Sequence, residues 1–255
     1  MGNNERAIKA KEHHEYMICS YKKDIEDSIK RSKVYEPDAY KNISQFMGKY
    51  EMEIKVVDLT TSEAIFEYGD GKNHLGVLNF ASYRYAGGGY IIGSLAQEEA
   101  LCHDSNLYEV LLSEYIQEEF YKKNLESLCN NLYTSRLVYS PDIVFVSDTV
   151  DIKCDVITCA APNIGAYLSK HRELDNYKDI LRDRIDNILY SAFENNVETL
   201  ILGAFGCGVF RNNPYNVAEV FRELIFDKYS ACFRKVIFAI PKGKNLDAFR
   251  EVFDI

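Results

Sequence analysis

Tryptophan is absent from this 255-residue chain, and only five prolines and 14 glycines interrupt it. No apolar run approaches the roughly 20 residues that a membrane-spanning helix needs. Internal repeats, low-complexity segments and flexible linkers are missing as well. Together with a hydrophobic content of 47%, these absences indicate one large globular domain, or a core domain with a helical addition.

Basic residues are also fewer than acidic residues. The chain has 30 Lys and Arg residues against 39 Asp and Glu residues, which gives a net charge of -9. This balance argues against general nucleic-acid binding through the phosphate backbone. A phosphate-bearing ligand would therefore have to be held mostly by backbone N–H groups, which favours a glycine-rich loop over a lysine patch.

The cysteines lack the spacing of a metal site. None of the seven forms a CxxC pair, and Cys154 and Cys159 are too far apart along a predicted strand to hold one zinc ion. We expect reduced structural cysteines in a cytoplasmic protein. The polar N-terminus has no signal-peptide core, and Arg6 stands where a myristoylation site that begins with Met1-Gly2 wants Ser or Thr.

Hydrophobic periodicity predicts alternating strands and helices in the second half of the chain. Helices are predicted over residues 4–32 (one long helix or a broken pair), from 96 into the 120s with an interruption at 103–106, and over 173–196, 214–229 and 245–255. Strands are predicted over residues 53–59, 75–82, 136–140, 142–148, the start of 154–163, 197–206 and 235–241. The alternation indicates parallel βαβ units in a three-layer α/β sandwich. His13 and His14 are predicted on the surface, and His103 and Asp104 at a helix end.

Three consecutive glycines, Gly87 to Gly89, stand seven residues ahead of the triplet Gln97-Glu98-Glu99. Ordered glycine costs conformational entropy, so this run indicates a tight turn or a close approach of the backbone to a ligand. Carboxylates that follow such a loop are candidates for acid/base chemistry. The alternative is structural, because the helix dipole favours carboxylates at the start of any helix. A second copy, Gln117-Glu118-Glu119, has no glycine loop and is interpreted as a solvated helix face.

A second loop has the same form as the first, with a buried strand running directly into small residues. It is "LILGAFGCGVFRNNP", which leads to a helix starting at Pro214 with Asn212 or Asn213 as its cap. Two such loops at the carboxyl ends of strands form a cleft suited to a diphosphate. Neither loop matches a Rossmann or P-loop motif. The alternative is that Gly203, Gly206 and Gly208 merely end a strand.

In combination, these motifs resemble the poly(ADP-ribose) glycohydrolases of the bacterial type. The resemblance rests on GGG, seven residues and QEE, together with "LNFAS" (78–82), "YSPDIVFV" (139–146), "APN" (161–163) and "GAFGCGVFRNNP" (203–214), and it covers roughly residues 50–240. It implies a macrodomain: a three-layer α/β/α fold with a mixed central sheet and an N-terminal helical extension. Residues 1–48 would be the accessory region and residues 49–255 the catalytic domain.

The resemblance also implies roles for individual residues. Glu99 would be the catalytic acid/base, and Glu98 would hold the ribose next to the scissile bond. The predicted substrate-binding residues are Asn79, Gly87, Gly88, Gly89, Gln97, Gly206, Cys207, Gly208, Val209 and Phe210. Phe210 would pack on the nucleotide, Asn79 would lie under the distal ribose, and Asp58 is a loose candidate for adenine. No metal and no cofactor are implied.

The implied reaction is hydrolysis of poly(ADP-ribose) from the chain end. Two alternatives stay open: removal of single ADP-ribose units from protein or nucleobase, and binding of ADP-ribose without cleavage. The expected ligand is ADP-ribose or its polymer, carried on ADP-ribosylated proteins or nucleic acid, and no membrane partner is expected. The chain departs from the family pattern at Tyr83-Arg84-Tyr85, where a short linker ending in Pro is usual, so this run is predicted to lie beside the cleft.

Overall fold

The computed structural model describes residues 2–40, 46 and 48–255. The strands are β1 Lys33–Tyr35, β2 Glu53–Val57, β3 Leu75–Phe80, β4 Leu137–Phe145, β5 Ile152–Cys159, β6 Thr199–Leu202 and β7 Lys235–Ala239. The α-helices are α1 Asn3–Ser20, α2 Lys22–Arg31, α3 Thr61–Tyr68, α4 Gln97–His103, α5 Leu107–Leu111, α6 Glu114–Ile116, α7 Lys123–Glu126, α8 Ile164–Leu168, α9 Tyr177–Glu194, α10 Pro214–Asp227 and α11 Lys244–Phe253. A 3-10 turn, η1, covers Tyr90–Ile92, and a π-helical turn covers Gln117–Lys122.

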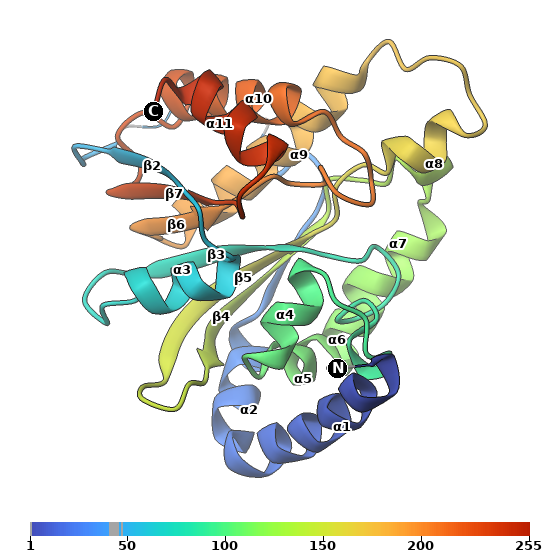
Figure 1. Cartoon of the computed structure of the whole chain (residues 1–255), viewed down its shortest axis with the longest axis vertical. Helices are drawn as coiled ribbons and strands as arrows, with labels where there is room; N and C mark the ends of the chain where they lie inside the picture. The colour runs from blue at the N-terminus through green and yellow to red at the C-terminus, as the bar shows by residue number, and fades with distance from the viewer. Residues whose placement is uncertain (1, 41–45, 47) are drawn as a thin grey trace.

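The strands form one mixed sheet in the order β1-β4-β5-β3-β6-β7-β2 (Figure 1). The four pairings from β5 to β2 are parallel, whereas β4 is antiparallel to both of its neighbours. The sheet confirms the predicted parallel units and the predicted mixed character. Because parallel strands end on the same side, the loops after β3, β5, β6 and β7 meet at one edge of the sheet.

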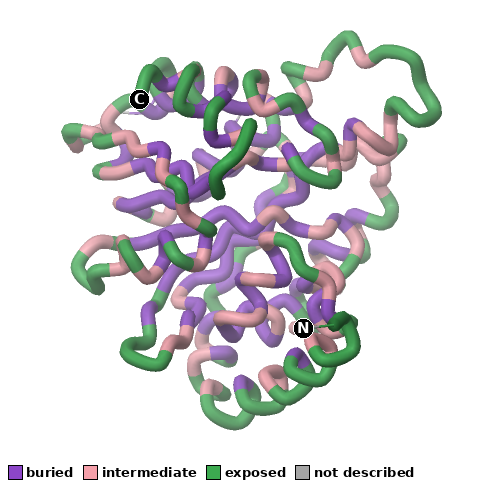
Figure 2. Tube along the Cα trace, viewed as in Figure 1, coloured by how far each residue is buried: buried purple, intermediate pink, exposed green. Residues whose placement is uncertain are grey.

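Helices cover both faces of the sheet, as a three-layer fold requires. Along β3, Val77 belongs to one apolar cluster and Leu78 to the other, because successive strand residues point to opposite faces. The cluster around Leu78 includes residues of α9, α10 and α11, and the cluster around Val77 includes residues of α2, α3, α4 and α5. Figure 2 shows the result, with buried strands lying between two more exposed helical layers.

The region around Pro141 differs from the prediction. The two strands expected on either side of it are one strand, β4, whose register against β5 shifts between Ser140 and Ile143. Asp142 in this bulge has a φ of 53°. Pro141 has no N–H group to donate to a sheet ladder, and a bulge is a position where a strand tolerates that loss. Hydrophobic periodicity also does not predict β1, α3 and α8, which are too short to show it clearly.

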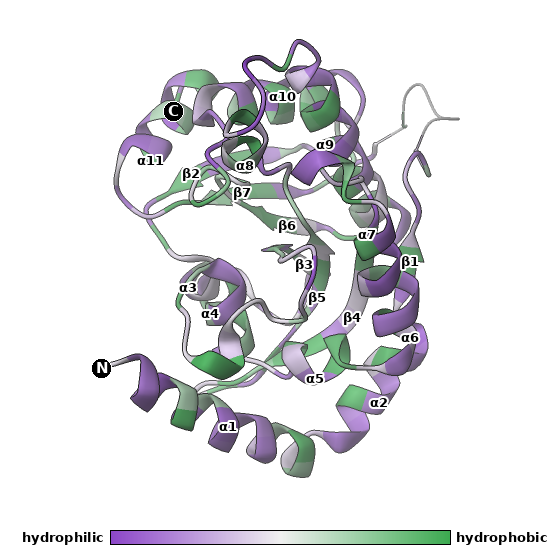
Figure 3. Cartoon of the chain, turned by 90° about the vertical axis from the view of Figure 1, so that its right-hand side faces the viewer, coloured by the Kyte–Doolittle hydropathy of each residue, from purple (hydrophilic) through white to green (hydrophobic). Residues whose placement is uncertain are grey.

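The predicted N-terminal helical extension is present as a broken pair, α1 and α2, with Tyr21 between the two helices. Figures 1 and 3 show α1 as the outermost helix of its layer, beneath α4 and α5. The strand β1, which follows α2, joins the central sheet by pairing with β4. The division into residues 1–48 and 49–255 stays a prediction, and residues 1, 41–45 and 47 lie outside the described residues.

The prediction that His13 and His14 lie on the surface is wrong. Both are half-buried on the inner side of α1, where His13 Nδ1 is 2.8 Å from the Tyr90 hydroxyl and His14 Nδ1 is 2.8 Å from Glu109 Oε1. The inner side of α1 is held partly by hydrogen bonds, so polar residues occupy positions that a hydropathy pattern assigns to solvent. His103, by contrast, ends α4 as predicted, with Asp104 as the C-cap.

The cysteines have the predicted structural character. All seven are unpaired, and five of them are buried. Cys154 and Cys159 lie within β5 and are at most 1% exposed.

Across the described ranges, no helix is long and apolar enough to cross a lipid bilayer.

Candidate active site

The triple glycine forms a tight turn between β3 and α4. Gly87 and Gly88 have left-handed backbone, with φ angles of 65° and 58°. A Cβ atom at Gly88 would lie 2.6 Å from Glu99 Oε1 and 3.0 Å from Glu98 Oε2. Glycine is therefore required here for two reasons, the backbone conformation and the close approach to both carboxylates.

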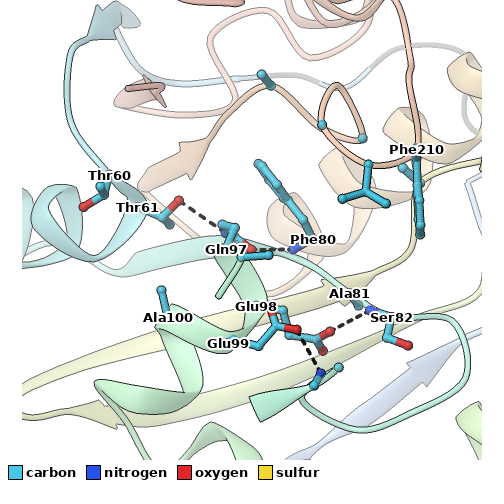
Figure 4. Close-up of a pocket in the computed structure, with 18 of the residues that line it drawn as sticks. Thr60, Thr61, Phe80, Ala81, Ser82, Gln97, Glu98, Glu99, Ala100 and Phe210 are labelled. Carbon is cyan, nitrogen blue, oxygen red and sulfur yellow. Dashed lines mark hydrogen bonds between the residues drawn. The ribbon is translucent and has the colours of Figure 1, made fainter. Parts of the chain in front are cut away.

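Glu98 and Glu99 lie in the first turn of α4 and are buried, with only 3% and 7% of their surfaces exposed. Glu98 accepts hydrogen bonds from the Ser82 amide at 2.7 Å and from Asn79 Nδ2 at 3.3 Å. Glu99 Oε1 accepts one from the Gly89 amide at 2.8 Å (Figure 4). A buried carboxylate needs such donors, and the loop that precedes α4 supplies two of the three.

Gln97 joins the start of α4 to the end of β3. Its Oε1 accepts from the Phe80 amide at 2.8 Å, and its Nε2 donates to the Leu78 carbonyl at 2.7 Å. The same Nε2 also reaches Thr61 Oγ1 at 3.3 Å (Figure 4). The side chain therefore continues the backbone hydrogen bonding of the strand and fixes the position of the two carboxylates that follow it.

The second loop, residues 203–213, lies across from the first. Its Asn212 side chain closes the turn by donating to the carbonyls of Gly206 and Pro162, at 3.0 and 2.9 Å. Asn213 caps α10 by accepting from the Tyr215 amide at 2.9 Å, which decides between the two predicted caps. Within the described residues, the amides of Gly206, Gly208, Val209 and Phe210 have no hydrogen-bond partner.

Both loops open onto one cavity of about 870 Å³, which is within the usual range for a ligand pocket. Of the predicted site residues, those that line it are Gly88, Gly89, Gln97, Glu98, Glu99, Gly206, Gly208, Val209 and Phe210. Further lining residues come from the start of α3 (Thr60, Thr61, Ser62), from the end of β3 (Phe80, Ala81, Ser82) and from the segment after β7 (Ile240, Pro241, Asn245). The structure therefore brings together two loops that lie more than a hundred residues apart in the sequence.

Comparisons with known proteins agree with this geometry. The model of the family described as "Microbial-type PARG, catalytic domain" matches residues 5–148. A crystal structure of poly(ADP-ribose) glycohydrolase (PARG) from Deinococcus radiodurans in complex with ADP-ribose is 31% identical, covers 90% of this chain and 97% of its own, and has a TM-score of 0.81. The chain belongs to the microbial-type PARG family.

Two structures from Thermomonospora curvata extend the similarity over almost the whole chain. The PARG structure without a stated ligand is 26% identical, with a TM-score of 0.88 and coverage of 98% of this chain and 100% of its own. The structure bound to the inhibitor ADP-HPD is 27% identical, with a TM-score of 0.86 and coverage of 97% and 99%. A search of curated protein sequences finds no match.

Four residues singled out in the sequence lie beside the PARG cavity without lining it. Asn79 is fully buried under Glu98, and its Nδ2 also reaches Thr158 Oγ1 at 3.3 Å. The Cys207 side chain belongs to the apolar core, and Gly87 packs near Tyr108. Asp58 Oδ1 accepts from the Lys242 amide at 2.7 Å, so it holds the segment after β7.

Burial dominates the electrostatics of the Glu98 carboxyl group. It raises the pKa of the Glu98 carboxyl to about 8, against the opposing effect of the hydrogen bonds from Ser82 and Asn79, and the neighbouring charge of Glu99 raises it further. The helix N-terminus would favour the charged form of Glu98, but desolvation outweighs it. Among the described residues that line the cavity there is no Lys or Arg, so a bound anion would meet mainly backbone amides.

The Tyr83-Arg84-Tyr85 run, predicted beside the cleft, divides between core and rim. Tyr83 is 2% exposed, and its ring stacks on Tyr133 with centroids 4.0 Å apart. The Tyr133 ring in turn lies 6.1 Å from that of Phe210, so the two tyrosines support the phenylalanine that lines the cavity. Tyr85 is 66% exposed and lines the cavity, which leaves it as the tyrosine of the run that can meet a ligand.

Sequence reasoning missed the contribution of α3 to the site. Thr60 caps this helix: its Oγ1 accepts from the Glu63 amide at 3.3 Å, and the Glu63 carboxylate accepts from the Thr60 amide at 2.7 Å. This capping box is visible in the sequence as Thr-x-x-Glu and predicts a helix start just after β2. The contributions of Pro241 and Asn245 have no local signal, because only the parallel sheet brings the end of β7 to the cavity.

Proposed function

We propose that this chain hydrolyses the ribose–ribose O-glycosidic bond of poly(ADP-ribose) from the chain end and releases ADP-ribose. Membership of the PARG family and the ADP-ribose and ADP-HPD complexes of its structural neighbours support a glycohydrolase that takes ADP-ribose. The observation that carries the proposal is the buried Glu98–Glu99 pair, which lies against Gly88 and Gly89 on the wall of one cavity.

The ligand follows from what the cavity offers. The unpartnered amides of the second loop suit a diphosphate, since in the described part of the chain these N–H groups are available and no cationic side chain lines the cavity. The Phe210 ring suits the base or the sugar of the nucleotide. The ribose at the scissile bond then lies against Gly88 and Gly89, where the absence of side chains leaves room beside the carboxylates.

Glu99 acts first as the general acid and then as the general base. Its Oε1 is held by the Gly89 amide, and its Oε2 accepts no recorded hydrogen bond within the described residues. A proton from the carboxyl moves to the departing ribose oxygen as the C1–O bond breaks. Water then attacks the oxocarbenium-like C1, and Glu99 takes up the proton that this water releases.

The raised pKa of Glu98 keeps the carboxyl group next to Glu99 in the chain protonated at neutral pH. With a pKa of about 8, Glu98 holds this proton near neutrality. Glu98 itself is tied to Ser82 and Asn79, which suits a residue that holds the ribose while Glu99 moves the proton.

Recognition of the chain end fits the charge of the protein. A net charge of -9 opposes binding along a polyanion, so the protein grips the terminal unit and little beyond it. Binding of long polymer should therefore depend only weakly on salt. A steep salt dependence would mean that many phosphates are neutralised, which contradicts terminal recognition.

The test is incubation of purified protein with auto-poly(ADP-ribosyl)ated carrier and, separately, with mono-ADP-ribosylated carrier, followed by chromatography of the released nucleotide. We expect free ADP-ribose from the polymer, without oligomers. Release from the mono-modified carrier alone would replace the proposal with a mono-ADP-ribosyl hydrolase. Calorimetric binding of ADP-ribose without any release would replace it with a binding module.

A further inference from the structure

The residue that directly follows the triple glycine connects the active-site loop to the N-terminal helix. Tyr90 is fully buried, and its side chain contacts α1. Its hydroxyl donates to the Ala10 carbonyl at 2.9 Å and lies 2.8 Å from His13 Nδ1. Figures 1 and 3 show α1 beneath α4, and the tyrosine joins α1 to the loop that precedes α4.

The hydrogen-bond roles at this junction are determined by chemistry. A carbonyl only accepts, so the single hydroxyl proton of Tyr90 is used on Ala10. His13 must therefore carry a hydrogen on Nδ1 and donate it to the Tyr90 oxygen. Burial, with a further effect from His103, lowers the pKa of His13 to about 4, so the imidazole is neutral over the pH range in which most enzymes are assayed.

A second contact holds the other end of the same turn. Arg6 Nε donates to the Gly93 carbonyl at 2.7 Å. Gly93 has a φ of 79°, and a Cβ atom there would lie only 2.3 Å from the Asn3 carbonyl and 2.9 Å from the Ala7 nitrogen. The backbone of η1 thus lies directly against the first turns of α1, and α1 holds η1 at both of its ends.

Contacts on the opposite side of Tyr90 reach the helix that carries the carboxylates. The His103 ring at the end of α4 packs edge-on against the Tyr90 ring, with centroids 4.7 Å apart, and the Tyr108 ring lies at 4.9 Å. The preceding residue, Gly89, donates its amide to Glu99 Oε1 at 2.8 Å. A displacement of Tyr90 would therefore move the donor that orients the proposed acid.

We infer that Tyr90 is a positioning residue for Glu99, and that α1, through Ala10, His13 and Arg6, holds the Gly87–Gly89 turn in its working geometry. This inference rests on the proposed function for its catalytic consequence. Its structural part, the coupling of α1 to the Gly89–Glu99 hydrogen bond, stands independently of which substrate the protein takes.

The first experiment compares Tyr90→Phe with wild type and with Tyr229→Phe. Tyr229 is a fully buried tyrosine in the opposite layer, whose hydroxyl donates to the Asp186 carboxylate at 2.5 Å and lies 3.0 Å from the Asp186 carbonyl oxygen, and it serves as the matched control. We expect Tyr90→Phe to lower kcat roughly tenfold or more, since small misplacements near reacting groups have effects of this size, with KM within about twofold. Tyr229→Phe should lower the unfolding midpoint and leave kcat at the wild-type value.

The second readout needs no turnover. Hydrogen exchange at the Gly89 amide should accelerate in Tyr90→Phe and in Gly93→Ala, but not in Tyr229→Phe. His13→Asn, which keeps a donor near the position of Nδ1, should behave like wild type, whereas His13→Leu should behave like Tyr90→Phe. Wild-type exchange at Gly89 in both Tyr90→Phe and Gly93→Ala would overturn the inference, whether or not the proposed function holds. An inactive wild type would overturn only the proposed function.

Discussion

The triplet Gln-Glu-Glu occurs twice in this chain, and the two copies have opposite environments. In the first, Glu98 and Glu99 are almost fully buried and receive hydrogen bonds from backbone amides and Asn79. In the second, the Glu118 and Glu119 side chains remain 53% and 43% exposed and pair with Lys122 and Lys123 one helical turn later. The second copy confirms the predicted solvated face.

The difference between the copies lies in what precedes and follows each of them. The first follows a glycine turn that presses its backbone against the carboxylates, and no lysine stands within reach along α4. The second continues from another helix and is followed by two lysines at the i, i+4 spacing that suits ion pairs. The same three residues therefore become either a site for chemistry or an ordinary surface, depending on the loop beside them.

The comparison is tested most strongly by removing one carboxylate from each triplet. We expect Glu99→Gln to lower the rate of ADP-ribose release roughly 10²- to 10⁴-fold, the usual contribution of a general acid/base. Glu119→Gln should leave that rate within experimental error. Both variants should still bind ADP-ribose in calorimetry, which shows that the loss is one of chemistry. Equal rates for the two variants would remove the distinction between the copies.

The second prediction concerns the glycine turn. Gly88→Ala places a methyl group 2.6 Å from Glu99 Oε1 in a left-handed backbone, so the carboxylate must move, and we expect kcat to fall about a hundredfold. Gly71→Ala is the matched control, because Gly71 has a similar φ of 65° with open space around it. Both variants carry backbone strain, so both should unfold at lower denaturant concentration. Only Gly88→Ala should lose activity.

The third prediction uses pH. The pKa of Glu98 lies at about 8 in the folded protein against an ordinary 4.5, so between these values the folded state keeps a proton that the unfolded state has lost. The free energy of unfolding therefore falls as pH rises from about 4.5 to 8. Glu98→Gln should abolish this part of the pH dependence, as measured by urea unfolding at pH 5 to 9. Glu118→Gln should show the wild-type dependence.

The smallest effect is expected at the second triplet. Lys122→Ala removes the exposed partner of Glu118, and exposed i, i+4 pairs contribute little to stability. We expect no measurable shift of the thermal unfolding midpoint and unchanged activity. A marked loss of either would show that the second copy is more than a solvated face.

Much of the fold follows from local sequence patterns. The buried runs of β3, β5, β6 and β7 and the amphipathic α9 and α10 are predictable because their periodicity is strong and each is bounded by a turn. The bulge at Pro141 and the pairing of β1 with β4 are not, because both depend on a partner strand distant in sequence.

The sequence predicts the residues at the center of the site but not those at its edges. The glycine turn, Glu98, Glu99 and the second loop carry signals in their own residues. The contributions of Pro241, Asn245 and α1 arise only when the chain folds, and the polar contact of His13 with Tyr90 gives no hydrophobic signal at all. The sequence places Tyr83 beside the cleft along with Tyr85, because sequence adjacency does not separate a buried side chain from an exposed one.

The central claim is that the buried Glu98–Glu99 pair marks the position of the scissile bond. The most direct measurement is a crystal structure of Glu99→Gln bound to a short ADP-ribose oligomer. We predict that the glycosidic oxygen of the terminal ribose lies about 3 Å from the side chain of residue 99, with the diphosphate on the amides of Gly206, Gly208, Val209 and Phe210. A complex in which the terminal ribose lies away from residues 98 and 99 would contradict the account.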